Sequence, residues 1–208
     1  MSQVLDFDVR DVVLSDGSFG PLEIRHIIDS LSQDAAKLPI FRDAVADLES
    51  RDVHTPASAV RLGVCQYLLG SYRAAQETLS KADGGALAHF YQGEAQLHLQ
   101  QYDGAIASYE SAKVAGYDPG VCELGIADAL RSSSRSEEAL RRLDNLSGAV
   151  EQTAGYLYQR GATIASMGGN PEEVCALYER AVSTDDDHAG ALFGLALEND
   201  RRGNDQVA

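Results

Sequence analysis

The feature of this sequence that most constrains its fold is a repeat of roughly 34 residues. Equivalent stretches begin near Pro56, Ala86, Gly120, Ala154 and Ala189, so successive starts are 30, 34, 34 and 35 residues apart. Each stretch reads as two helices joined by a short polar or glycine-containing turn. A unit of this length cannot bury its apolar face alone and must stack on its neighbours. The period therefore predicts an array of helical hairpins without one central core.

The second helix of each unit carries the clearest pattern. In the unit at 86–119 the turn falls near Gln101, and Ala105, Tyr109 and Ala112 follow at positions i, i+4 and i+7, on one helical face. Small residues let two helices approach closely, and the aromatic ring fills the gap beside them. The corresponding residues of the other units are Ala75, Leu79 and Ala82, then Ala139, Leu143 and Leu146, then Val174, Tyr178 and Ala181.

These residue types in this order resemble the tetratricopeptide repeat family, whose units are helix-turn-helix hairpins of this length. The resemblance covers residues 56–208. Two positions depart from the family pattern, because Gln92 stands where a leucine is usual and Leu146 where an alanine is usual. The resemblance implies an all-α, right-handed superhelical solenoid of antiparallel helix hairpins.

Two segments precede the repeats. Residues 21–55 carry apolar residues at helical spacing on both sides of Lys37, which predicts a degenerate hairpin that caps the array. In residues 1–20, apolar side chains alternate with aspartates from Leu5 to Val9, which predicts an extended segment. We expect this segment to dock on the repeats, either capping the first hairpin or filling part of the groove.

The charge of the chain narrows the class of partner. Lys and Arg number 17 against 32 Asp and Glu, a formal net charge of -15 with a pI near 4.6. Such a chain repels phosphate backbones and anionic lipid on average. We therefore expect no direct nucleic-acid binding and no membrane binding by this segment.

The cysteines and the N-terminus indicate a compartment. Cys65, Cys122 and Cys175 are odd in number, far apart and set in helix-like apolar patterns, which predicts buried free thiols and a reducing environment. The N-terminus has no basic start followed by an apolar run, as a signal peptide would. These features together predict a cytoplasmic protein.

The sequence contains no phosphate-binding glycine loop ending in Lys-Ser or Lys-Thr, no Gly-x-Ser-x-Gly, no His-Glu-x-x-His and no Cys-x-x-Cys. The absence of these motifs favours a non-enzymatic protein without a cofactor or metal. His89 and His98 lie nine positions apart on an expected helix and project in opposite directions, so they do not suit one metal ion. The acidic run Asp185–Asp187 lacks the spaced ligands of a calcium loop. We interpret it as a solvated linker that brings negative charge to the next helix N-terminus.

Function in an array of this kind lies on the concave face, which is lined mainly by the first helices. By the geometry of the family, that face displays Val60, Val64, Tyr67, Phe90, Glu94, Leu97, His98, Leu124, Asp128, Arg131, Tyr158, Phe193 and Leu197. Some family members hold acidic C-terminal tails with basic residues and asparagines on this face. Here Val60, Val64, Glu94 and Asp128 occupy such positions, so we expect a hydrophobic or basic ligand instead.

Two functions follow from the resemblance. The first is a scaffold that binds a partner polypeptide on the concave face. For the second, 146–154 and 190–200 are similar to a planctomycete-type bacterial family whose members join such repeats to a domain like the C-terminal domain of the RNA polymerase alpha subunit. That similarity implies a regulatory or targeting arm of a larger transcription-related protein. Because the sequence ends inside an expected helix, at Ala208, we expect a longer protein.

Overall fold

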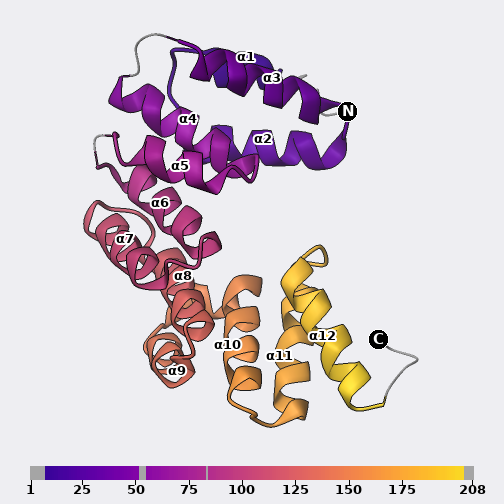
Figure 1. The fold of residues 1–208 in the computed structure, drawn as a ribbon. Coiled ribbons are helices and arrows are strands. Elements are labelled where there is room, and N and C mark those ends of the chain that lie inside the picture. The colour runs from indigo at the N-terminus through magenta and orange to yellow at the C-terminus, as the bar shows by residue number, and fades with distance from the viewer. Residues whose placement is uncertain (1–7, 52–54, 83, 204–208) are drawn as a thin grey trace. The chain divides into compact units, whose positions relative to one another are not determined.

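The computed structural model describes residues 8–51, 55–82 and 84–203, and within these ranges the secondary structure is α-helix and one 3-10 helix, with no strand (Figure 1). The chain divides into two compact units, Met1–Leu99 and Gln100–Ala208, called the N-terminal and C-terminal units below. Each is built from helical hairpins, so the prediction of an all-α hairpin fold is confirmed.

The N-terminal unit contains six of the helices. They are α1 (Val9–Leu14), α2 (Pro21–Gln33), α3 (Lys37–Glu49), α4 (Pro56–Leu68), α5 (Tyr72–Leu79) and α6 (Ala86–His98). Helices α4 and α5 pair as a hairpin, and α6 packs against both. Helix α4 starts where Thr55 accepts a hydrogen bond from the Ser58 N–H and Pro56 follows in the first turn, a typical start signal.

Helix α1 differs from the sequence prediction. The expectation of extended chain is wrong for Val9–Leu14, which form a helix capped by Asp8, whose carboxylate accepts a hydrogen bond from the Arg10 N–H at 2.8 Å. Val9 and Val13 lie one helical turn apart and are both buried. The burial of this apolar pair decides for helix over strand. The alternating residues before Asp8 lie outside the described residues.

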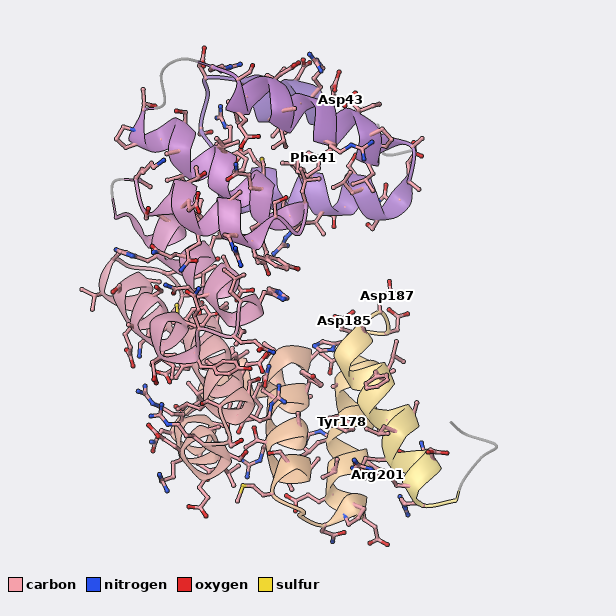
Figure 2. All side chains as sticks on the ribbon, in the orientation of Figure 1. Phe41, Asp43, Tyr178, Asp185, Asp187 and Arg201 are labelled. Atoms are coloured by element: carbon pink, nitrogen blue, oxygen red, sulfur yellow. The ribbon has the colours of Figure 1, made fainter. Side chains whose placement is uncertain are left out.

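Helix α1 lies beside α3 and contacts it more extensively than α2 does (Figure 1). Figure 2 shows Phe41 directed inward from α3 and Asp43 directed outward. The apolar core around Phe41 consists of Val9, Val13, Ile27, Phe41, Ala44, Val45, Leu48, Leu62 and Cys65. Residues Val9–Leu14 therefore pack as a helix on the region expected to be a simple hairpin, and both α1 and α3 contact α4.

The break between α2 and α3 also differs slightly from the prediction. It falls at 34–36, before the expected position near Lys37. Pro39 consequently sits in the first turn of α3, where its missing N–H removes no intrahelical hydrogen bond.

The C-terminal unit contains the remaining helices of the described chain. They are α7 (Tyr102–Val114), α8 (Pro119–Ser132), α9 (Ser136–Asp144), the 3-10 helix η1 (Gly148–Gln152), α10 (Ala154–Ser166), α11 (Pro171–Thr184) and α12 (Ala189–Arg201). Helices α8 and α9 form one hairpin, α10 and α11 form the next, and α12 packs on α10 and α11. Leu146, expected within the second helix of its repeat, lies beyond the end of α9, and η1 packs on α10.

The turn after each first helix repeats a backbone conformation. Positive φ angles occur at Gly70 (75°), Gln100 (59°), Ser134 (63°), Gly168 (71°) and Gly203 (70°). Successive members are 30, 34, 34 and 35 residues apart, the same series as the repeat starts. This left-handed residue closes the helix C-terminus and aims the chain into the next helix. The same backbone conformation therefore recurs at this spacing even where the turn residue is not glycine.

Candidate partner-binding surface

In the N-terminal unit the predicted surface residues come from α4 and α6, the first helices of two successive repeats. Val64 is completely buried and Phe90 nearly so, because both side chains pack between helices. Both side chains therefore lie beneath the surface on which the sequence analysis predicts them. Val60, Tyr67, Glu94 and Leu97 are partly exposed, and His98 is exposed.

Aromatic rings gather where α4, α5 and α6 meet. The Tyr67 ring lies 5.6 Å from Tyr72, 5.2 Å from Tyr91 and 5.8 Å from His98, measured between ring centroids. Tyr72 and His98 are stacked in parallel, with centroids 4.2 Å apart and planes 3° apart. We call Tyr67, Tyr72, Tyr91 and His98 the tyrosine–histidine cluster.

A carboxylate adjoins this cluster. The Tyr67 hydroxyl donates a hydrogen bond to Glu94 Oε2 at 2.8 Å, which links α4 to α6. Burial, followed by the neighbouring negative charge of Glu94, raises the pKa of Tyr67 far above its usual value. Tyr67 therefore stays a neutral hydrogen-bond donor, and the carboxylate of Glu94 is held at the edge of the rings.

In the C-terminal unit the two charged residues of the predicted set, Asp128 and Arg131, pair with each other, whereas the buried Nε of Arg131 has no hydrogen-bond partner. Arg131 forms an ion pair with Asp128 within α8, and Ser132 Oγ donates to the same Asp128 oxygen at 3.2 Å. Leu124, also on α8, packs toward α10, because a Cβ placed at Gly155 would lie 3.3 Å from Leu124 Cδ1. Asp128 is thus largely neutralised within its own helix.

Tyr158 packs within the stack of α10, α11 and α12. Its ring lies 6.0 Å from Tyr178 and 5.1 Å from His188. A Cβ placed at Gly190 would come within 2.8 Å of Tyr158, so the α12 backbone lies directly on this ring. Tyr158 is only partly exposed and contributes to packing as well as to the surface.

Tyr178 lies on α11 (Figure 2). It occupies a slot between two glycines, Gly161 of α10 and Gly194 of α12. A Cβ at either position would lie 2.9 Å or 2.7 Å from the Tyr178 ring, closer than contact distance. Burial raises the pKa of Tyr178 to about 12, and the neighbouring Tyr158 adds to the shift. Tyr109 packs in the same way against Gly125. The aromatic residues that the repeat pattern singled out are therefore interlocking packing residues.

Helix α12 carries the most exposed apolar side chains of the predicted set. Phe193 is 72% exposed and Leu197 39%, and Leu192 beside them is 43% exposed. Phe193 and Leu197 lie one turn apart and therefore on one face of the helix.

The sequence reasoning missed Tyr72, Tyr91 and Leu192 as surface or cluster residues. Tyr72 begins α5 and stacks on His98. The sequence feature that could have identified Tyr72 is its place in the repeat, because Tyr102 holds the equivalent place one repeat later.

Within the described residues, no group of three or more His, Cys, Asp or Glu side chains is arranged to hold a metal ion. Asp185 and Asp187 lie at the exposed turn before α12 (Figure 2). The adjacent His188 caps that helix by accepting a hydrogen bond from the Ala191 N–H at 3.2 Å.

The three cysteines are buried free thiols as predicted, and burial raises the pKa of Cys65 to about 12 and of Cys122 to about 11. Among the described residues, no helix has the length and apolar character needed to cross a membrane.

Comparison with known proteins identifies the fold. No protein-family model and no curated protein matches this chain. Among solved structures, a thermophilic tetratricopeptide protein of Thermus thermophilus has a TM-score of 0.63 and 17% identity, covering 86% of this chain and 96% of that chain. The C-terminal part of a repeat protein from Cytophaga hutchinsonii has a TM-score of 0.57 and 17% identity, covering 88% and 72%. YrrB, described as a tetratricopeptide protein with an unusual peptide-binding site, has a TM-score of 0.50 and 18% identity, covering 80% and 86%. At these identities the likeness establishes the fold, which is that of tetratricopeptide-repeat proteins.

Proposed function

We propose that this chain is a non-enzymatic scaffold that holds a segment of a partner polypeptide against its first helices. The observation that carries the proposal is the tyrosine–histidine cluster, which joins α4 to α6 beside the carboxylate of Glu94. Aromatic rings offer large contact area at low entropic cost and are enriched in binding surfaces. The likeness to YrrB, whose own description names a peptide-binding site, supports the same class of function.

The chemistry of the cluster favours a basic segment of the partner. The faces of tyrosine rings attract Lys and Arg cations, and a carboxylate beside the rings adds to that attraction. The net charge of -15 attracts basic chains and repels acidic ones at long range. On the C-terminal unit, Phe193 and Leu197 offer a separate contact for apolar side chains of a partner.

The transcription-related alternative stays a prediction of the sequence similarity, and no contact in the described part of the chain favours it. The cytoplasmic location likewise stays a prediction.

Panning the chain against a library of random peptides displayed on phage tests the proposed function. We expect the recovered peptides to be enriched in Lys or Arg together with apolar residues. Tyr72→Leu keeps apolar bulk but removes the ring that stacks on His98, and it should weaken binding of a recovered peptide by about three- to thirtyfold. Fluorescence anisotropy with a labelled peptide measures the change.

Tyr102→Leu is the matched control, because Tyr102 begins the second helix of the next repeat as Tyr72 does in its own. It should leave peptide affinity unchanged. Enrichment of acidic peptides, absence of any enrichment, or equal effects of the two substitutions would contradict the proposal.

A further inference from the structure

Helix α12 exposes an apolar face on the C-terminal unit. Leu192, Phe193 and Leu197 are all exposed, and they lie within one sector of the helix together with the partly exposed Ala196. The other side of α12 packs on α10 and α11. We call Leu192, Phe193, Ala196 and Leu197 the α12 face.

The repeat register indicates what kind of surface fits against Phe193. Phe193 lies ten residues before the left-handed turn residue that follows its helix, and Leu124 and Tyr158 hold that place in the two preceding repeats. Each of these two side chains lies against a glycine of the next first helix. A Cβ at Gly155 would be 3.3 Å from Leu124, and one at Gly190 would be 2.8 Å from Tyr158. Among the described helices none covers Phe193 in this way, and its side chain is 72% exposed.

Ala196 gives the same indication. It lies seven residues before the left-handed turn residue, where the two preceding repeats have Ala127 and Gly161, both buried. Helix α11 covers Gly161, since a Cβ there would lie 2.9 Å from the Tyr178 ring. Ala196 is only partly buried. The α12 face therefore combines large and small side chains in the positions at which earlier first helices pack against another helix.

Acidic residues flank the α12 face at both ends. Asp200 lies two turns after Phe193 on the same side of the helix, and Asp185–Asp187 precede the helix (Figure 2). All four aspartates are exposed, and within the described ranges none of them forms an ion pair. The N-terminus of α12 offsets only about half of one negative charge. Residues 204–208, outside the described ranges, contain one aspartate and no Lys or Arg.

The arginines of α10–α12 do not balance these carboxylates. Arg201 pairs with the buried Glu198 at 2.6 Å, and Arg202 donates to a cysteine thiol of α11 at 3.5 Å. The arginines of α10 and α11 are Arg160 and Arg180, and both line a separate depression next to the end of α9. The surroundings of the α12 face are therefore negative.

These charges decide which helix suits the α12 face. A second copy of this chain carries the same net charge of -15 and is repelled at long range. A helix with basic residues before and after its apolar side is attracted at both ends of the α12 face. Its apolar side removes the exposed surface of Phe193 and Leu197 from water.

We infer that the α12 face binds an amphipathic helix of a partner polypeptide, which places a glycine or alanine against Phe193 and Lys or Arg at both ends of its apolar side. The small residue lets the partner backbone approach the ring, as the α12 backbone approaches Tyr158 at Gly190. This inference rests on the proposed function, because it takes α12 as one of the first helices that hold the partner.

Panning against a phage library of helix-forming peptides about eighteen residues long, varied on one helical side, tests the inference. Phage that bind the Leu197→Lys variant are removed first, and those that bind the unaltered chain are then kept. We expect the recovered peptides to have Gly or Ala in the middle of an apolar side and Lys or Arg towards both ends. Recovery of no peptides, or of peptides with acidic ends, would overturn the inference.

Fluorescence anisotropy with a labelled recovered peptide measures the part of Phe193. Phe193→Lys should weaken binding by about tenfold or more, because it removes the central ring of the contact. Val114→Lys makes a matched change at a side chain on α7 that is 91% exposed, and it should leave binding unchanged. Circular dichroism checks that both variants stay folded. Equal effects of the two substitutions would contradict the inference.

A second pair of variants tests the flanking charge. Asp200→Asn should weaken peptide binding by about two- to fivefold, because one end of the α12 face loses its carboxylate. Glu137→Gln on α9 removes an exposed carboxylate that likewise forms no ion pair within the described ranges, and it should leave binding unchanged. If both variants weaken binding alike, the attraction comes from the net charge of the chain, and the assignment of basic ends to the partner helix is wrong.

Two further measurements separate this inference from its alternatives. Sedimentation equilibrium should show a monomer, whereas a dimer that Phe193→Lys dissociates would mean that a second copy covers the α12 face. Tyr72→Leu should leave binding of the helical peptide unchanged. Peptides that depend on Tyr72 and not on Phe193 would keep the proposed function and overturn this inference. Peptides that bind at Phe193 when none binds at the tyrosine–histidine cluster would keep this inference and remove the observation that carries the proposed function.

Discussion

The region α1–α3 and the repeats of the C-terminal unit bury apolar surface in different ways. In α8–α12, aromatic side chains enter slots left by glycines on neighbouring helices, as Tyr178 does between Gly161 and Gly194. In α1–α3, Phe41 and its neighbours form a small compact core, and α1 packs on α3, which is not its neighbour in sequence. A periodic sequence encodes the first arrangement. The second arrangement is a core that occurs once in the chain and follows no repeat.

The largest expected effect distinguishes the two regions directly. Phe41→Ala should destabilise α1–α3 by about 3–5 kcal/mol, because the side chain is completely buried in the core of that region. Since each repeat depends mainly on its neighbours, we expect amide hydrogen exchange to accelerate in α1–α3 while α10–α12 keep their protection. Hydrogen exchange with mass spectrometry measures both.

Leu38→Ala on the same helix is the control, because Leu38 is 49% exposed and should cost less than about 1 kcal/mol. Equal acceleration of exchange in α10–α12 on Phe41→Ala would mean that the chain unfolds as one cooperative body, and the distinction between the two regions would fail.

A smaller effect tests the interlock in the repeats. Gly161→Ala should destabilise the chain by about 1–3 kcal/mol, because the new Cβ would meet the buried Tyr178 ring at 2.9 Å. Gly155→Ala on the same helix meets only the end of the Leu124 side chain at 3.3 Å, so helix propensity should make it neutral or stabilising by about 0.5–1 kcal/mol. Urea unfolding compares the two variants. Similar stabilities would show that the slot tolerates a methyl group.

The smallest effect concerns the repeated turn. Ser134 adopts a positive φ of 63° where other repeats have glycine, so Ser134→Gly should stabilise the chain by about 0.5–1 kcal/mol. Ser133→Gly, at a φ of -93° and with loss of the hydrogen bond from Ser133 Oγ to the Leu130 carbonyl, should destabilise it by a similar amount. Thermal unfolding should show shifts of opposite sign. Shifts of the same sign would mean that the left-handed turn carries no strain.

The candidate site was predicted less completely than the fold. The repeat pattern placed Tyr67, Glu94 and His98 on first helices, and the structure brings them into contact. It did not reveal that Val64 and Phe90 are buried, because helical periodicity gives the side of a helix and not the depth of cover that neighbouring helices provide. The stacking of Tyr72 on His98 joins two helices that are consecutive in the stack, and no local pattern encodes such a pair.

The repeat in the amino-acid sequence is sufficient to predict the helical hairpins and their order, because contacts between neighbouring repeats recur at a fixed spacing that the chain repeats in its residue types. The helical fold of α1 and the surroundings of Arg61 could not be predicted in this way. Both depend on contacts between residues distant in sequence, such as Val13 and Phe41 in one core and the hydrogen bond from Arg61 to the Gly17 carbonyl. The free energy of such contacts outweighs the local alternation that favoured a strand, and no period in the sequence records them.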